Sequence, residues 1–111
     1  MLKIETAKTS KYTTIKLIGE VDASNSVELD EAIVSLVEGD TMNLLVDGTQ
    51  LEYISSAGLG VFMSYIEEFN DKDINLVIFG LNEKVFHVFH ILGLDQLINI
   101  KPNEEDALTA L

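Results

Sequence analysis

The sequence has no cysteine, few basic residues and no long apolar run, and each absence excludes a class of protein. Without cysteine, the chain forms neither a disulfide framework nor a thiolate metal site. No apolar run approaches the roughly 20 residues that a membrane-spanning helix needs. The start of the chain also lacks the basic and apolar segments of a signal peptide. These absences predict a cytoplasmic protein without a membrane segment.

The shortage of basic residues leaves a strong negative charge. Seven Lys and Arg face nineteen Asp and Glu, which gives a net charge of −12 at pH 7. Such a surface repels the phosphates of nucleic acids and of anionic lipids, so neither is an expected partner. A basic patch on a protein partner fits this charge, and so does acidity that serves solubility alone.

The length and apolar content of the chain predict one globular domain over residues 1–111, with no repeat or linker. Strands alternate with amphipathic helices, a pattern typical of parallel βαβ units, and two adjacent strands at the start predict a hairpin. The predicted fold class is therefore α/β: a mixed, mostly parallel sheet of about five strands with about four helices and an N-terminal β-hairpin. The predicted strands cover residues 2–5, 12–18, 42–46, 74–79 and 97–100.

The predicted helices begin at polar caps and end at glycine or polar residues. The first begins at Ser24 or Asn25, with Glu28 completing a capping box, and stops at Gly39-Asp40. The second begins at Ser55 or Ser56 and ends near residues 70–73. A third follows Asn82, and a last short one opens at residues 102–105. The expected buried stripes are Leu29, Ala32, Ile33 and Leu36; Leu59, Phe62, Met63 and Ile66; and Val85, Val88, Phe89 and Leu92.

The start of the second helix is the main candidate site. A hydroxyl of Ser55 or Ser56 lies at a helix N-terminus, where the dipole and the free N–H groups favour negative charge. The small residues Ala57, Gly58 and Gly60 let another chain or a phosphate approach the backbone. A serine-capped helix whose glycines pack closely on a sheet explains the same pattern, and spacing alone does not separate the two interpretations.

Two acidic residues are expected near these serines. Asp22 and Asp47 each follow a predicted strand, and functional groups in open α/β sheets gather beyond the carboxyl ends of the strands. We therefore expect Asp22, Asp47 and the two serines at one end of the sheet. Solvated strand ends or Asx-turns are the alternative for both aspartates.

The chain offers little for catalysis or metal binding. His87 and His90 lie three residues apart on a predicted helix but have no third ligand nearby, so we interpret them as surface histidines. No histidine is adjacent to the serines to act as a base, and the Gly-x-Ser-x-Gly, dinucleotide-binding and P-loop motifs are all absent. We expect no enzymatic activity, no metal and no cofactor.

The serine motif resembles the signature of a known family. Tyr53-Ile54-Ser55-Ser56-Ala57-Gly58-Leu59-Gly60-Val61 resembles the central motif of STAS domains, in particular of the stand-alone bacterial anti-sigma factor antagonists. Further segments resemble the family in the same order, so that the likeness covers nearly the whole chain. These segments are Gly19–Asp22, Leu44–Asp47, Val85–Phe89 and Leu92–Leu94.

The resemblance implies a switch. Ser56 falls where the family carries the serine that a partner kinase phosphorylates. Ser55 falls on a position that is often Asp, and this departure leaves it as a second candidate. The unphosphorylated form would bind an anti-sigma factor or a switch serine kinase and relieve its inhibition. Phosphorylation would end that binding, and a serine phosphatase would reverse it. The partner-binding residues implied are Asp22, Asp47, Ser55, Ser56, Ala57, Gly58, Leu59 and Gly60.

The family resemblance also admits a second function. STAS domains occur in ligand-sensing and scaffold assemblies, and some are linked to nucleotides. A nucleotide-binding or scaffold module without a phosphorylation switch is therefore the alternative. The resemblance leaves the oligomeric state open.

Overall fold

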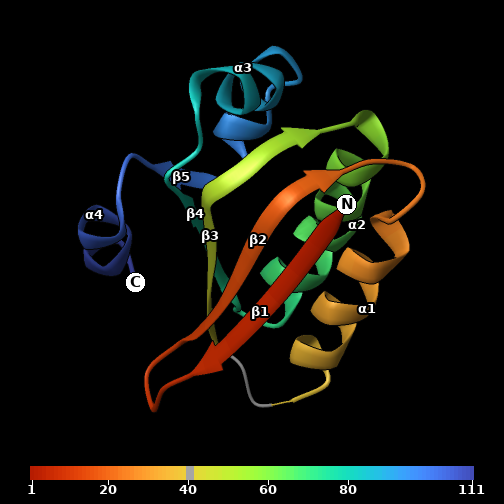
Figure 1. The fold of residues 1–111 in the computed structure, drawn as a ribbon. Helices are drawn as coiled ribbons and strands as arrows, with labels where there is room; N and C mark the ends of the chain where they lie inside the picture. The colour runs from red at the N-terminus through yellow and green to blue at the C-terminus, as the bar shows by residue number, and fades with distance from the viewer. Residues whose placement is uncertain (40–41) are drawn as a thin grey trace.

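Strand β2 (Thr13–Val21) lies between β1 (Leu2–Lys8) and β3 (Asn43–Ile54), its neighbours in the sequence, and the strand order of the sheet follows the chain throughout (Figure 1). The computed structural model describes residues 1–39 and 42–111. The β1–β2 pair is antiparallel and the other pairs are parallel. This confirms the predicted fold class. The elements are β1 Leu2–Lys8, β2 Thr13–Val21, α1 Ser26–Val37, β3 Asn43–Ile54, α2 Ser56–Asp71, β4 Asn75–Phe79, α3 Glu83–Ile91, the 3-10 helix η1 Leu94–Gln96, β5 Asn99–Lys101 and α4 Glu104–Thr109.

Helices cover the sheet unequally on its two faces (Figure 1). The larger core joins one face to α1, α2 and α3. In it the rings of Phe62 and Phe89 pack together, with their centroids 6.2 Å apart. The smaller core joins the opposite face to α4 through Ala107. Neighbouring residues of β3 therefore enter different cores, as Leu44 and Leu45 do. This explains why the start of β3 lacks polar alternation.

Strands β2 and β3 are longer than predicted. Residues 19–21, expected to leave the sheet, remain paired in β2. The strand predicted to end at residue 46 is also longer, because β3 continues to Ile54. The pairing with β2 shifts register between Lys16 and Ile18, and Asp47 Oδ1 accepts hydrogen bonds from Thr49 N at 3.0 Å and Thr49 Oγ1 at 2.7 Å. The turn-forming residues mark a bulge inside a strand.

Several helix details also differ from the predictions. Met63 and Leu92 are about half exposed, and Ala32 and Leu36 are only partly buried. Tyr65, and not Met63, lies on the buried face of α2, and its hydroxyl donates to Asp30 on α1. Asn82 caps α3, accepting from Val85 N at 2.8 Å, as predicted. Helix α1 ends at Val37, just before the predicted stop at residues 39–40, of which residue 40 lies outside the described residues. The other boundaries agree within a few residues.

Strands β1 and β5 form the two edges of the sheet. Most of β1 is exposed, and Lys3 Nζ and Glu5 Oε2 form an ion pair at 3.4 Å along it. Within residues 1–39 and 42–111, no helix combines the length and apolar character needed to cross a membrane.

A side-chain hydrogen bond links α2 to α1. The Tyr65 hydroxyl donates to Asp30 Oδ1 at 2.8 Å, and the Tyr65 ring stacks on Phe69 with the ring centroids 5.7 Å apart. Burial raises the pKa of Tyr65 to about 12, and the neighbouring Asp30 carboxylate adds to this increase. The neutral phenol is therefore the form that the fold favours.

We expect the Tyr65→Phe variant to lose about 1 kcal/mol of unfolding free energy at neutral pH, the net value of one hydrogen bond. The folded pKa of Tyr65 lies above its unfolded value near 10, so the stability that Tyr65 contributes is complete below pH 10. That contribution disappears as the pH rises toward about 12. Urea unfolding of both proteins from pH 7 to 12 tests this. The difference in stability should shrink above pH 10, and parallel pH profiles would contradict the assignment.

Candidate functional site

The carboxyl ends of β2 and β3 lie side by side and carry the candidate site. Val21 pairs with Ile54 in the parallel register, and Ser55 N donates to Val21 O at 2.8 Å. Asp22 and Ser55 therefore leave adjacent strand ends. The loop before α1 and the first turn of α2 meet at this point.

Asn25 fastens the loop before α1 to the end of β2. Its Oδ1 accepts from Asp22 N at 2.9 Å, and its Nδ2 donates to Glu20 O at 3.0 Å. The side chain is buried, with 7% of the residue exposed. Asn25 is the N-cap residue of α1 by position, but its side chain makes no capping hydrogen bond. Sequence reasoning treated Asn25 as a cap and missed this role, although an Asn closing a four-residue polar turn is a usable signal.

Asp22 is held as a carboxylate within the same loop. Its Oδ1 accepts from Ser24 Oγ at 2.5 Å and from Ser24 N at 2.9 Å. These two hydrogen bonds lower the pKa of Asp22 below its usual value. Asp22 is therefore ionised at neutral pH and places a negative charge beside the strand ends.

The two adjacent serines differ in accessibility. Ser55 is the N-cap residue of α2, and its carbonyl accepts from Leu59 N at 3.0 Å. Its Oγ is buried and makes no hydrogen bond within the described part of the chain. Ser56, the first residue of α2, is exposed. Of these two adjacent serines, Ser56 is therefore the exposed one.

The small residues that follow separate into an inner and an outer group. Gly58 and Leu59 are buried, and Gly58 faces the ends of β2 and β3. A Cβ at Gly58 would lie 2.6 Å from Val21 Cγ1 and 2.7 Å from Ile54 Cγ1. Gly60 is exposed, and a Cβ there would have no heavy atom within 4 Å. Gly58 thus serves the packing of α2, and Gly60 leaves the outer backbone open.

Asp47 does not join this group, so its predicted placement beside Asp22 and the serines is wrong. It lies within β3, opposite Lys16 and Phe79, where β4 ends. Ile54 lies seven residues further along the strand, which at roughly 3.3 Å per residue is about 23 Å along the chain. Its Oδ1 is already bonded to Thr49.

The two histidines lie on α3. Both are exposed, and His90 Nδ1 lies 2.7 Å from Asp95 Oδ2 while its ring stacks on Phe86. Among residues 1–39 and 42–111, no group of three or more His, Cys, Asp or Glu side chains could hold a metal ion. The prediction that these are surface histidines is confirmed.

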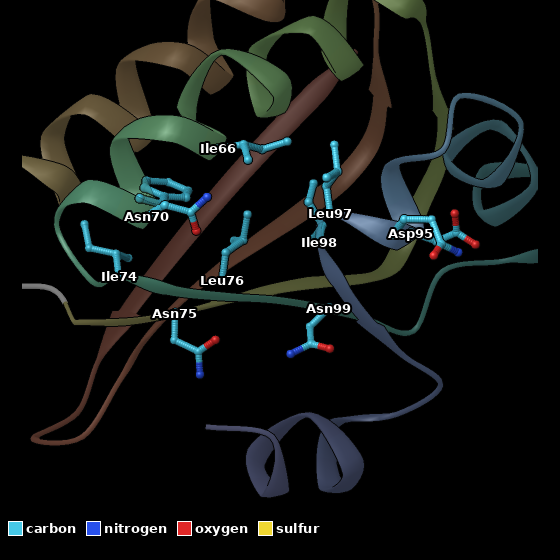
Figure 2. A pocket seen from close by; sticks show the side chains of 11 residues that line it. Ile66, Asn70, Ile74, Asn75, Leu76, Asp95, Leu97, Ile98 and Asn99 are labelled. Carbon is cyan, nitrogen blue, oxygen red and sulfur yellow. The ribbon is translucent and has the colours of Figure 1, made fainter.

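A small cavity lies at the other end of α2 from the serines. Figure 2 shows it between the end of α2, the start of β4 and the segment that leads into β5. It has a volume of about 270 Å³, with Asn70, Asp95 and Asn99 among its polar lining residues. None of the predicted site residues lines it. The candidate site is therefore a feature of the open surface and does not belong to this cavity.

Comparison with known proteins finds matches in both sequence and structure. The family model of the STAS domain matches residues 3–107. An anti-sigma-B factor antagonist from Staphylococcus epidermidis is 32% identical over 104 residues, which cover 94% of this chain and 96% of that protein.

Solved structures share the fold. An anti-sigma factor antagonist from Mycobacterium paratuberculosis has a TM-score of 0.91 at 23% identity and covers 99% of this chain and 93% of its own. The anti-sigma factor antagonist SpoIIAA in its unphosphorylated form has a TM-score of 0.80 at 18% identity, with coverages of 96% and 93%. Bacillus SpoIIAA in its phosphorylated form has a TM-score of 0.73 at 19% identity, with coverages of 99% and 98%.

The two glycines of α2 should respond in opposite ways to alanine. Gly58→Ala forces a methyl group against Val21 and Ile54 and should cost about 1–3 kcal/mol of unfolding free energy. Gly60→Ala adds a methyl group in open space and should gain up to about 1 kcal/mol from helix propensity. Urea denaturation of both variants checks the pair. Equal effects would show that α2 does not approach the strands so closely.

Removing the Asn25 side chain should loosen the loop that carries Asp22. Asn25→Ala leaves Asp22 N and Glu20 O without their partners and should cost about 1–3 kcal/mol. Amide hydrogen exchange should speed up at residues 22–26. The control is Asn99→Ala, which makes the same chemical change at an exposed position of β5. Equal losses of unfolding free energy in the two variants would contradict the role assigned to Asn25.

Proposed function

The chain belongs to the STAS domain family, and from this membership we propose that it is a regulatory binding protein of the anti-sigma factor antagonist type and not an enzyme. In this proposal residues 1–111 act as one domain in the cytoplasm, where ATP and sigma factors are found. The unphosphorylated form binds an anti-sigma factor or related serine kinase and relieves its inhibition. Phosphorylation of Ser56 ends the binding, and a serine phosphatase restores it.

The exposure of Ser56 is the observation that carries this proposal. A kinase needs a hydroxyl that it can reach, and of the two adjacent serines only Ser56 is exposed. In the transfer step, Ser56 Oγ bonds to the γ-phosphorus of ATP, ADP leaves, and the hydroxyl proton passes to a base on the kinase. The phosphatase then returns the hydroxyl by adding water and releasing phosphate.

The fold should tolerate the added phosphate. A phosphoserine carries about −1.5 to −2 charges at pH 7. Ser56 is the first residue of α2, where the helix dipole and unpaired N–H groups favour an anion. The first turn of α2 contains no acidic residue that would repel it. A structure of SpoIIAA in phosphorylated form supports the view that this fold accommodates the modification.

The binding surface that we propose surrounds Ser56. On α2, Ser56, Gly60 and Met63 follow one another at helical spacing and are all exposed, Met63 by 50%. Asp22 adds an ionised carboxylate from the adjacent loop. A partner packed on this face would have to remove water from the phosphate dianion, with Asp22 nearby. Such a burial without a paired cation is costly, so the phosphate opposes docking.

Two substitutions at Ser56 test the switch. We expect Ser56→Ala to bind the serine-kinase partner but accept no phosphate from ATP, and Ser56→Asp to bind at least about tenfold more weakly, a loss of about 1.4 kcal/mol. Calorimetry measures binding, and phosphopeptide mass spectrometry locates the phosphate. Both variants should melt close to the wild-type temperature. The matched control is Ser35→Asp, an exposed position in the second half of α1, which should bind normally.

Three results would contradict the proposal: equal binding by the two Ser56 variants, unfolding of the aspartate variant alone, or phosphate on another residue. Binding of ATP or GTP without phosphate transfer would favour the ligand-sensing alternative.

A further inference from the structure

The hydroxyl of Ser55 is a polar group for which the proposed switch gives no role. Both backbone groups of Ser55 are bonded, since its N donates to Val21 O at 2.8 Å and its O accepts from Leu59 N at 3.0 Å. Its Oγ is buried and has no partner in the part of the chain that the structure describes. A buried hydroxyl without a hydrogen bond lowers stability. The unphosphorylated protein therefore retains an unfavourable group next to Ser56.

Helix capping does not explain this hydroxyl. Ser55 has the extended backbone of an N-cap residue, with φ −88° and ψ 174°, but its side chain makes no capping hydrogen bond. A serine at this position normally accepts from the second or third N–H of the helix. The exposed phospho-acceptor and the unpaired hydroxyl belong to consecutive residues. A phosphate on Ser56 would bring three strong acceptor oxygens to this helix end.

We propose that Ser55 is a positioning residue for the phosphorylated form, in which its hydroxyl, after rotation about χ1, donates a hydrogen bond to the phosphoryl group on Ser56. This inference rests on the proposed function, because it requires phosphate on Ser56. The hydroxyl and the first N–H groups of α2 together hold the dianion against the helix end. The phosphate is then fixed in the orientation that blocks docking.

The proposal predicts opposite effects of one substitution in the two states. In the unphosphorylated protein, Ser55→Ala removes an unpaired buried hydroxyl, so the melting temperature should stay the same or rise. Loss of a true serine cap would instead lower it by about 4 °C. In the phosphorylated protein, the same substitution removes a charge-assisted hydrogen bond. The melting temperature should then fall by about 5 °C.

The decisive measurement is a phosphorus NMR titration of protein with phosphoserine encoded genetically at position 56. This preparation needs no kinase. A donor to the dianion lowers the second pKa of the phosphate, so we expect the Ser55→Ala titration to move upward by about half a pH unit or more. Ser55→Thr keeps a hydroxyl and should restore the wild-type midpoint. The matched control is Ser64→Ala, whose exposed hydroxyl on α2 donates to Val61 O at 2.6 Å, and it should change nothing.

Two outcomes would overturn the role of Ser55. One is an unchanged titration in Ser55→Ala. The other is an equal loss of melting temperature in both phosphorylation states, which would make Ser55 an ordinary cap. Failure of any kinase to modify Ser56 would overturn the proposed function and leave this measurement unaffected, so the two failures are distinguishable.

Discussion

The close approach of α2 to the ends of β2 and β3 is the constraint on which the candidate site depends. It is possible because residue 58 has no side chain to separate the helix from Val21 and Ile54. The hydrogen bond between Ser55 N and Val21 O fixes the entry of the helix. With its start fixed in this way, α2 turns Leu59 into the core and Ser56 toward solvent. The same packing that stabilises the domain therefore presents its exposed hydroxyl.

Much of the fold could be predicted because local signals and tertiary packing agree. Asn82 marks the start of α3 and caps it, and the buried strand over residues 44–46 reads as apolar on both faces. The errors occur where a local signal has a second use. Asp47 and Gly48 are turn-forming residues, but the sheet uses them for a bulge. Periodicity predicted Met63 as buried in place of Tyr65, whose hydroxyl donates to Asp30, 35 residues away in the sequence.

At the candidate site too, the sequence alone predicts the local element but not how its side chains are oriented. Sequence placed a pair of serines at a helix start, but spacing could not say which hydroxyl is exposed. That depends on how the N-cap residue is oriented between a strand and a helix, which is a property of the packed structure. The role of Asn25 depends on the turn that brings its side chain back to the backbone of Glu20 and Asp22, and spacing alone does not show this contact. Asp47 was predicted to follow the end of a strand, but β3 continues to Ile54, so Asp47 lies inside the strand.

The lysines of β1 affect whether the sheets of different molecules can pair at this edge. This strand borders the sheet with its outer edge unpaired, an arrangement that invites a strand from a neighbouring molecule to add on. Lys3 and Lys8 place charged side chains along that border, and natural proteins use lysine there to discourage ribbon-like aggregation. The lysines of β1 therefore oppose the addition of a further strand at this edge of the sheet.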